Sequence, residues 1–450
     1  MTAAAPESAV PDVAVVGFGY IGSVIAAVLA ARGLSVVGID TNAEMIAALN
    51  QGKCPIPEPG LEDLVAAGVK AGKLSGSTDP AAAKGVKAIL ITVGTPLSDE
   101  FEADLSHIRA ACGAVAPYVA DGQLIMIKST VPPGTTRLMH DEIFAPRARV
   151  HMAFSPERLA EGQAIRDLQS IPILVGGMDT EAGEACADFW RKAIPTIDVM
   201  ALTSPEAAEM VKLADNLWID LNVALANELA KLADALPYPI DVMEVIGGAN
   251  SLKKGQHHVN ILHPSNGVGG YCLTKDPWFV DALGRRAGIE LKIPRASREV
   301  NDSMPVHVFG RVDAFLKAQG IAAEDAKIAL LGFAFKSNSG DCRFTPVGPL
   351  VAALREAGYG DKLTICDPMV TTREATHHGI VLEPDWRKTV EGAHAVLILA
   401  GHDEFTAITA DDLGDLAAPG ALVYDGRIYY PRARINELEA RGLSYIGVGR

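Results

Sequence analysis

Residues that can carry out covalent chemistry gather around one cysteine of this sequence. Cys272 lies in the glycine-rich segment Gly267-Val268-Gly269-Gly270-Tyr271-Cys272-Leu273-Thr274-Lys275-Asp276. A nearby cation such as Lys275 favours the thiolate form of a thiol. A carboxylate four residues further on, Asp276, can act as a base on the same helical face. Single cysteines are more often small buried hydrophobic residues, but these neighbours favour a nucleophile.

A second motif, Gly17-Phe18-Gly19-Tyr20-Ile21-Gly22, is typical of a dinucleotide-binding turn because it follows a strand pattern and opens a helical one. In such turns the first glycine permits the tight bend. The second lets a pyrophosphate approach the backbone, and the third lets the helix pack closely. Asp40 ends the next strand pattern, where a carboxylate binds both ribose hydroxyls and disfavours a 2′-phosphate. The motif therefore predicts NAD, and a nucleotide cofactor together with a candidate thiol nucleophile indicates oxidation through a covalent thio-intermediate.

The composition narrows the class of protein. The chain has 450 residues, of which 49% are hydrophobic, and a formal net charge of −15. Proteins that bind nucleic acid usually carry a basic excess, so we expect no nucleic-acid partner. The apolar runs are far shorter than the roughly 20 residues of a membrane-spanning helix, the first residues show no secretion signal, and the six cysteines lack CxxC spacing. We expect a cytoplasmic protein with no membrane association, no metal site and no disulfide framework.

Strand and helix patterns alternate near both ends of the chain, and a helical stretch with few Gly or Pro residues lies at about 204–234. Such alternation indicates a parallel sheet covered by helices on both faces. The sequence therefore predicts an α/β fold with two Rossmann-like doubly wound parallel-sheet domains joined by a central helical domain. We place the three domains at 1–200, 201–305 and 306–450.

Four further segments accompany the two motifs in a fixed order along the chain. They are Ser129-Thr130-Val131-Pro132, Pro156-Glu157-Arg158-Leu159-Ala160-Glu161-Gly162, Glu209-Met210-Val211-Lys212-Leu213-Ala214-Asp215-Asn216, and Gly332-Phe333-Ala334-Phe335-Lys336 with Asp341 and Arg343. With these segments the chain resembles the UDP-glucose/GDP-mannose dehydrogenase family nearly from end to end. Members of that family oxidise a sugar nucleotide to the uronate with two NAD.

The resemblance implies a catalytic role for each of several residues. Cys272 would capture the C6 aldehyde as a thiohemiacetal, and water would hydrolyse the thioester formed by the second oxidation. Asp276 would act in base chemistry and water activation. Lys212 and Asn216, four residues apart on a helix, would face one oxyanion. Two further residues would position water or relay protons, namely Thr130 and Glu161.

The resemblance also implies the ligand contacts and a homodimer built on the central helices. The cofactor contacts would be Gly17, Gly19, Tyr20, Ile21, Gly22, Asp40, Thr95 and Thr130. The substrate contacts would be Glu157, Arg158, Lys212, Asn216, His258, Asn260, Gly269, Phe335, Lys336, Arg343 and Arg427. The last domain would hold the UDP moiety, with Lys336 and Arg343 on the diphosphate. Alternatively, that domain would serve oligomerisation alone.

The sugar is less clearly indicated. The segments Ser155-Pro156-Glu157-Arg158, His258-Val259-Asn260-Ile261 and Asp276-Pro277-Trp278-Phe279 resemble the branch that acts on UDP-N-acetylhexosamines, UDP-N-acetylmannosamine especially. That branch usually has Arg in place of His258 and His in place of Tyr271, and Lys275 is more typical of the UDP-glucose branch. We expect a UDP-N-acetylhexosamine 6-dehydrogenase, with UDP-glucose 6-dehydrogenase as the alternative.

Two other classes of protein share part of this pattern. A nucleotide-sugar-binding protein without catalysis would have the same domains, but the retained Cys272, Lys212 and Asp276 argue against it. A dehydrogenase of the 6-phosphogluconate or hydroxyacid type has a Rossmann domain and a helical domain. It uses a Lys/Asn pair without a covalent cysteine, and it lacks a C-terminal nucleotide domain. Replacement of Cys272 by alanine would separate the covalent mechanism from this simpler one.

Overall fold

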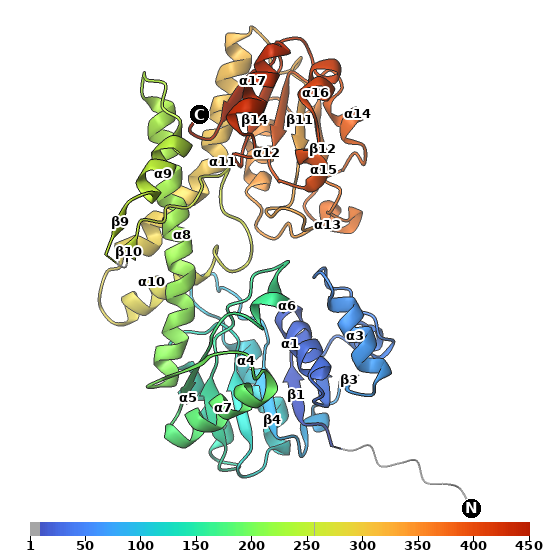
Figure 1. The fold of residues 1–450 in the computed structure, drawn as a ribbon, viewed down its shortest axis with the longest axis vertical. Coiled ribbons are helices and arrows are strands. Elements are labelled where there is room, and N and C mark those ends of the chain that lie inside the picture. The colour runs from blue at the N-terminus through green and yellow to red at the C-terminus, as the bar shows by residue number, and fades with distance from the viewer. Residues whose placement is uncertain (1–9, 256) are drawn as a thin grey trace, which may run out of the picture. The chain divides into compact units, whose positions relative to one another are not determined.

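The computed structural model describes residues 10–255 and 257–450, and the chain divides into two compact units (Figure 1). The first unit ends at Asp215 and the second is Asn216–Arg450. The helix α8, Pro205–Ala235, contains the boundary between them. No helix in the described part of the chain is long and apolar enough to cross a membrane.

An eight-stranded sheet in the order β3-β2-β1-β4-β5-β6-β7-β8 forms the centre of the described part of the first unit. The order reverses between β1 and β4, which gives the switch point where ligands bind in doubly wound folds. Neighbouring strands are parallel except for β6 and β7, which are antiparallel. The strands are β1 Val13–Val16, β2 Val36–Ile39, β3 Leu74–Ser77, β4 Ala88–Ile91, β5 Leu124–Ile127, β6 His151–Phe154, β7 Ile173–Gly177 and β8 Val199–Leu202.

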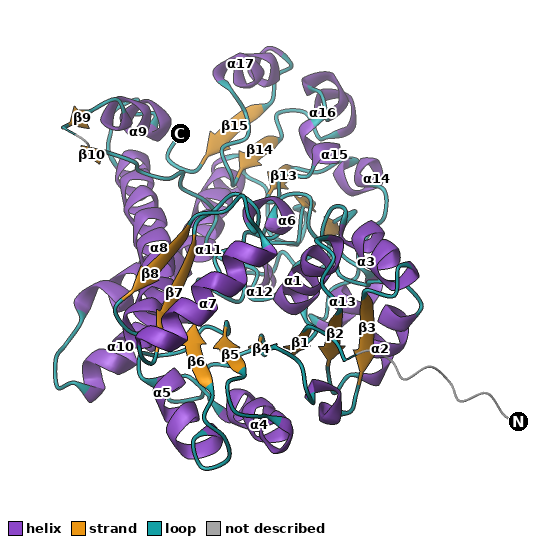
Figure 2. Cartoon of the chain, turned by 60° about the horizontal axis from the view of Figure 1, so that its bottom comes forward, coloured by secondary structure: helices purple, strands orange, loops and turns teal. Residues whose placement is uncertain are grey.

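Both faces of this sheet are covered, so its central strands are apolar throughout. Val13 and Val15 of β1 face one core cluster, which contains residues of α1 and α7, while Ala14 and Val16 face the other, which contains residues of α4 and α5. Figure 2 shows these helix pairs on opposite sides of the row of strands. The helices are α1 Tyr20–Ala31, α2 Ala43–Asn50, α3 Leu61–Lys70, α4 Ser106–Val115, α5 Thr135–Met139, α6 Ala164–Asp167 and α7 Thr180–Ala193, with the shorter turns η1 Pro80–Ala83, η2 Ala116–Tyr118 and η3 His140–Phe144.

The second unit begins with helices. After α8 come α9 Val242–Asn250, the small hairpin of β9 Lys253–Lys254 and β10 His257–His258, α10 Asp276–Arg286 and α11 Lys292–Ala318. Pro305 lies inside α11. A proline there leaves the carbonyl four residues earlier without its helical partner, yet the helix continues for 13 more residues to Ala318 because its apolar face, including Val308 and Val312, is buried against the following domain.

A five-stranded parallel sheet in the order β12-β11-β13-β14-β15 follows. Its two faces bury separate clusters, one against α11 and α12 and the other against α14, α16 and α17. The elements are β11 Ile328–Leu331, α12 Val347–Glu356, β12 Leu363–Cys366, α13 Thr372–His377, α14 Trp386–Val390, β13 Ala395–Ile398, α15 Asp403–Thr406, α16 Ala410–Leu416, β14 Leu422–Asp425, α17 Arg432–Ala440 and β15 Ser444–Gly447. The predicted fold class, two parallel-sheet domains with helices between them in sequence, is confirmed.

Candidate active site

The turn after β1 has the shape that the dinucleotide motif predicts. Gly17 has a φ of +94°, and a Cβ atom at Gly22 would lie 2.0 Å from the carbonyl oxygen of Gly17, so both positions require glycine. A Cβ at Gly19 would meet no atom within 4 Å. Open space beside the backbone at Gly19 is what a pyrophosphate needs in order to approach the first turn of α1.

Two side chains beside this turn also fit a dinucleotide. Asp40 follows β2, and its carboxylate accepts hydrogen bonds from the amides of Phe18 at 2.6 Å and Asn42 at 2.8 Å. These bonds hold the carboxylate at the strand end, and each oxygen keeps a further lone pair for a ribose hydroxyl. Thr95 follows β4 and is 3% exposed, and its hydroxyl has no hydrogen-bond partner among the described residues. Buried hydroxyls are normally paired, so Thr95 is suited to a ligand contact.

The loop that carries Thr130 is fastened to α8 by a buried acid that the sequence analysis did not single out. The Oε2 atom of Glu209 accepts from the Gly134 amide at 2.6 Å. Its Oε1 atom accepts from the amide and the hydroxyl of Thr136 at 2.7 and 2.6 Å. Burial raises the pKa of Glu209 to about 7 against these bonds. One turn of helix after Glu209 comes Lys212, so the Thr130 loop and Lys212 share one anchor.

Lys212 forms a buried ion pair with another predicted site residue. Its Nζ atom lies 3.3 Å from Oε2 of Glu157, with 7% and 10% of the two side chains exposed. The Leu159 amide donates a short hydrogen bond to Oε1 of Glu157. The neighbouring Arg158 pairs with a different acid, Asp215, and its Nε atom lies 3.0 Å from Oδ2 of that residue.

A second lysine, Lys128, contacts the segment that contains Glu157. It directly follows β5, and its Nζ atom donates to the carbonyl of Ser155 at 3.0 Å and lies 4.9 Å from the centre of the Trp190 ring. Burial lowers the pKa of Lys128 to about 8, while the charge of Glu157 acts in the other direction. A small cavity, about 20 Å³ in volume, lies beside Lys128 and Glu157. We infer that Lys128 fixes the turn from which Glu157 projects.

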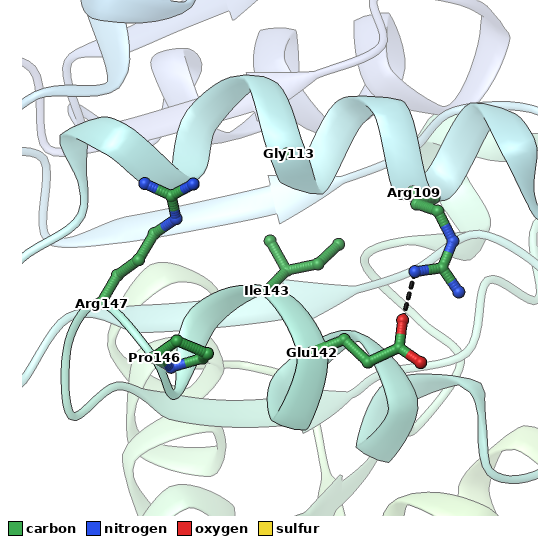
Figure 3. A pocket seen from close by; sticks show the side chains of 6 residues that line it. All are labelled: Arg109, Gly113, Glu142, Ile143, Pro146 and Arg147. Atoms are coloured by element: carbon green, nitrogen blue, oxygen red, sulfur yellow. Dashed lines mark hydrogen bonds and ion pairs between the residues drawn. The ribbon is translucent and has the colours of Figure 1, made fainter.

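An open hollow of about 540 Å³ elsewhere in this unit contains none of the predicted site residues. It lies between α4 and η3. The exposed pair of Arg109 on α4 and Glu142 on η3 spans it, and Arg147 lies on the same side as Glu142 (Figure 3). An exposed pair of this kind adds little stability and offers no enclosed chemistry. The predicted residues of this unit lie instead in the segments after the strands, on the first turn of α1 and on α8.

In the second unit Asp276 is hydrogen-bonded to two other predicted site residues, Asn216 and Cys272. Asp276 is fully buried at the start of α10, and its two oxygens lie 2.5 Å from Nδ2 of Asn216 and 2.5 Å from Nζ of Lys275. The Asp276 amide donates to the carbonyl of Cys272 at 2.9 Å. Asn216 follows Lys212 by one turn of α8, so the helix presents both side chains on one face.

All six cysteines of the chain lie in described residues. Cys272 is exposed, and the other five are buried. The glycines before it make room for an aromatic ring. A Cβ at Gly269 would lie 2.5 Å from Cβ of Phe335, and one at Gly270 would lie 2.6 Å from the end of the same ring. The Leu273 carbonyl accepts a bond from the buried Arg298, which also pairs with Asp220 at 2.7 Å. The thiol is thus exposed on a loop whose backbone is held firmly.

The remaining predicted substrate residues of this unit lie either after strands of the five-stranded sheet or near the β9–β10 hairpin. Arg427, after β14, donates to the carbonyls of Leu399, after β13, and Phe335, after β11, so it marks the carboxyl edge of the five-stranded sheet. Arg343 pairs with Asp341 through bonds of 2.8 and 2.5 Å. Three more residues complete the prediction: Lys336 directly follows Phe335, and His258 and Asn260 are exposed near the β9–β10 hairpin.

The five-stranded sheet also has a carboxylate that follows a strand and accepts a hydrogen bond from a neighbouring turn, but here a histidine covers it. Asp367 follows β12 as Asp40 follows β2, and it accepts from the Phe333 amide at 2.7 Å. Here, however, His402 lies 3.2 Å from the same carboxylate oxygen and covers it. Burial acts to raise the pKa of Asp367, but His402 and the backbone amides lower it overall. A ribose could not reach this buried carboxylate as it could reach Asp40, which fits a different nucleotide in the second sheet domain.

Known protein families match the chain along most of its length. The model for the NAD-binding domain of the UDP-glucose/GDP-mannose dehydrogenase family matches residues 11–194, that for the central domain 206–303, and that for the UDP-binding domain 329–432. A UDP-N-acetyl-D-mannosamine dehydrogenase of Methanococcus maripaludis is 33% identical over 411 residues, which cover 90% of each chain. An NDP-N-acetyl-D-galactosaminuronic acid dehydrogenase of Ralstonia nicotianae is 34% identical, covering 89% of this chain and 93% of the relative.

Solved structures show the same similarity. The UDP-D-ManNAc dehydrogenase of Pyrococcus horikoshii aligns with a TM-score of 0.85 at 31% identity, over 97% of this chain and 99% of that one. A UDP-glucose dehydrogenase of Pyrobaculum islandicum aligns with a TM-score of 0.85 at 28% identity, over 99% of both chains. The chain therefore belongs to the UDP-glucose/GDP-mannose dehydrogenase family and is an NAD-dependent nucleotide-sugar dehydrogenase.

Proposed function

We propose that this enzyme oxidises the C6 hydroxyl of a UDP-N-acetylhexosamine, UDP-N-acetylmannosamine first among them, to the carboxylate in two two-electron steps. The observation that carries the proposal is Cys272, an exposed thiol on a fixed loop beside the buried Asp276. Relatives named as UDP-N-acetyl-D-mannosamine dehydrogenases support the sugar. So do the segments around Glu157 and Asn260 noted in the sequence.

In this mechanism the Gly17–Gly22 turn and Asp40 would hold NAD, which would supply the hydride acceptor for both oxidations at C6. Between the two oxidations Sγ of Cys272 adds to the aldehyde carbon and forms a thiohemiacetal. The second oxidation leaves a thioester, which water hydrolyses to the carboxylate, and the thiol is regenerated. One alcohol, one water and two NAD⁺ thus yield one carboxylate, two NADH and three protons.

One charged and one neutral hydrogen-bond donor of the chain would stabilise the oxygen on which negative charge develops. The ammonium group of Lys212 and the amide of Asn216 are the donors for this oxyanion, and they extend from one face of α8. Asp276, held by Asn216 and Lys275, would accept a proton during thiol addition and hydrolysis. We assign Thr130 and Glu161 to the placement of the water.

We also propose that the three domains lie at 1–200, 201–305 and 306–450, and that the enzyme is a cytoplasmic homodimer. The dimer would form along α8, where a row of large apolar side chains is exposed. These are Trp218, Leu221, Leu225 and Leu232. Exposed apolar rows of this length on a helix mark an interaction surface. Light scattering of the purified protein would show a mass of two chains, and Leu225→Glu would shift it to one chain.

The number of NADH formed per sugar consumed tests the proposed reaction. The panel would contain UDP-glucose, UDP-N-acetylglucosamine, UDP-N-acetylmannosamine and UDP-N-acetylgalactosamine. We expect two NADH per UDP-N-acetylmannosamine and lower kcat/KM for the others. Cys272→Ala should abolish formation of the acid, whereas Cys112→Ala, which removes a buried thiol, should retain it. One NADH per sugar with accumulation of the aldehyde would exclude the thioester route.

UDP-glucose is the second candidate because Lys275 occupies the position typical of that branch. Its ammonium group lies 2.5 Å from Asp276 and 4.4 Å from the centre of the Phe279 ring. A preference for UDP-glucose in the same panel would select this candidate.

A further inference from the structure

A buried carboxylate connects the dinucleotide-binding turn to the segment that carries Glu161. Glu58 lies in the loop before α3 and is 6% exposed. Its Oε2 atom accepts from the Gly162 amide at 2.6 Å, and its Oε1 atom accepts from the Ala164 amide at 2.8 Å. The hydroxyl of Tyr20 donates a short hydrogen bond to Oε2 and accepts from the Gly162 amide at 3.1 Å. One phenol and one carboxylate therefore share the same backbone amide.

The backbone of Tyr20 forms part of the cofactor turn, at the opposite end of the residue from its hydroxyl group. It is the first residue of α1 and directly follows Gly19, whose backbone faces open space. Glu161 directly precedes Gly162. Burial and the bond to Glu58 raise the pKa of Tyr20, and the charge of Glu161 adds to the increase. A change at the backbone of Tyr20 thus reaches Glu161 through two hydrogen bonds.

The amides on either side of Glu161 are held by two different acids. The Ala160 amide donates to Oδ2 of Asp167 at 3.0 Å, and the Gly162 amide donates to Glu58. Asp167 belongs to α6, so its bond is local. Glu58 lies 104 residues before Gly162 and alone of the two acids contacts the cofactor turn. Charge-assisted bonds to a buried carboxylate are strong and costly to leave unmade, so Glu58 sets where this part of the segment lies.

We propose that Glu58 is a positioning residue that transmits occupancy of the NAD turn to Glu161 through Tyr20. Binding of NAD at the first turn of α1 restricts Tyr20, and the shared bonds to Glu58 and Gly162 then restrict the segment around Glu161. The role of Glu161 in catalysis rests on the proposed function. The coupling itself concerns NAD binding and does not depend on the identity of the sugar.

Hydrogen exchange of the full-length enzyme with and without NAD tests the coupling. We expect saturating NAD to slow amide exchange at least about fivefold in the peptide that covers residues 157–168, as for a coupling of about 1 kcal/mol. In Tyr20→Phe this slowing should be lost, although the peptide of α1 remains protected by NAD. Tyr20→Phe keeps the bonds of Glu58 to Gly162 and Ala164, so the fold of the segment is retained.

Matched variants separate coupling from general destabilisation. Glu58→Gln should also lose the NAD-dependent slowing, whereas Glu62→Gln, four residues later and exposed, and Tyr118→Phe should keep it. In kinetics, Tyr20→Phe should lower kcat about tenfold with little change in KM for the sugar nucleotide. If Tyr20→Phe keeps the full NAD-dependent slowing, or the wild-type segment shows none, the proposal is overturned. Absence of sugar turnover in the wild type would contradict the proposed function but leave the exchange result readable.

Discussion

The ammonium nitrogen of Lys212 lies 3.3 Å from a carboxylate oxygen of Glu157, and each side chain is about nine-tenths buried. Removal of one partner from a buried pair leaves the other charge without compensation, at a typical cost of about 3–5 kcal/mol. The pair also joins α8 to the segment after β6. It therefore combines a structural task with the oxyanion-stabilising role proposed for Lys212.

A double-mutant cycle would separate these two tasks. We expect Lys212→Met and Glu157→Gln each to lower the Tm by roughly 6 °C or more, and the double variant to lose less than the sum. The kcat of Lys212→Met should fall about 10²–10³-fold, and the double variant should not recover it. Thermal unfolding and steady-state kinetics of the four proteins would measure this. Strict additivity of the Tm changes would contradict the pairing.

Gly19 and Gly22 should respond differently to alanine. At Gly19 a Cβ meets no atom and the backbone is extended, so Gly19→Ala should leave the Tm unchanged. It should weaken NAD binding at least about tenfold, because the methyl group occupies the approach of the pyrophosphate. Gly22→Ala should lower the Tm as well, since its Cβ would lie 2.0 Å from a carbonyl oxygen. Gly113→Ala on α4, where a Cβ is also free of contacts, is the control for calorimetric titration with NAD.

Thiol reactivity should be confined to one position. Since Cys272 is exposed and the other five cysteines are buried, the folded enzyme should react quickly with about one equivalent of an aromatic disulfide reagent per chain. Cys272→Ala should remove this fast phase and leave the Tm within about 2 °C, because little apolar area is lost. Fast labelling of two or more thiols in the native enzyme would show that the buried cysteines are accessible.

The buried amine of Lys128 should make stability rise with pH. Burial lowers its pKa from 10.5 to about 8, so between these values the unfolded chain binds more protons than the folded one. Raising the pH across this range therefore stabilises the fold, by up to about 3 kcal/mol in total. Lys128→Met removes the titrating group but keeps the packing. The Tm of the wild type relative to this variant should increase from pH 8 to pH 10, and a constant difference would argue against the lowered pKa.

Glu209 should be sensitive to loss of one acceptor oxygen. Both of its carboxylate oxygens accept backbone amides, from Gly134 and from Thr136, and glutamine offers one oxygen only. Glu209→Gln should therefore cost about 1–3 kcal/mol and lower the kcat through the Thr130 loop. Glu206→Gln, which alters a pair with Arg137 nearer the surface, should cost less than about 1 kcal/mol. Equal effects of the two variants in urea denaturation would contradict the anchoring role.

Local patterns were sufficient where the determinant lies within a few residues. The spacing of Gly17, Gly19 and Gly22 predicted a turn whose conformation the structure confirms. The alternation of strands and helices predicted the two parallel-sheet domains, and the scarcity of Gly and Pro residues at 204–234 predicted α8. The antiparallel pairing of β6 with β7 and the passage of α11 through Pro305 did not follow from such patterns, since burial in the tertiary structure overrides the local preference.

The sequence by itself determined the family and the cofactor turn and predicted which residues react, because these depend on residue type and short spacing. Only the tertiary structure decided how those residues are held. Glu58 reaches Gly162 across 104 residues, Glu209 reaches Thr136 across 73, and Lys128 reaches Ser155 across 27. A single acid or lysine has no periodicity that reveals its partner. Its role arises when folding removes it from water and makes each of its hydrogen bonds obligatory.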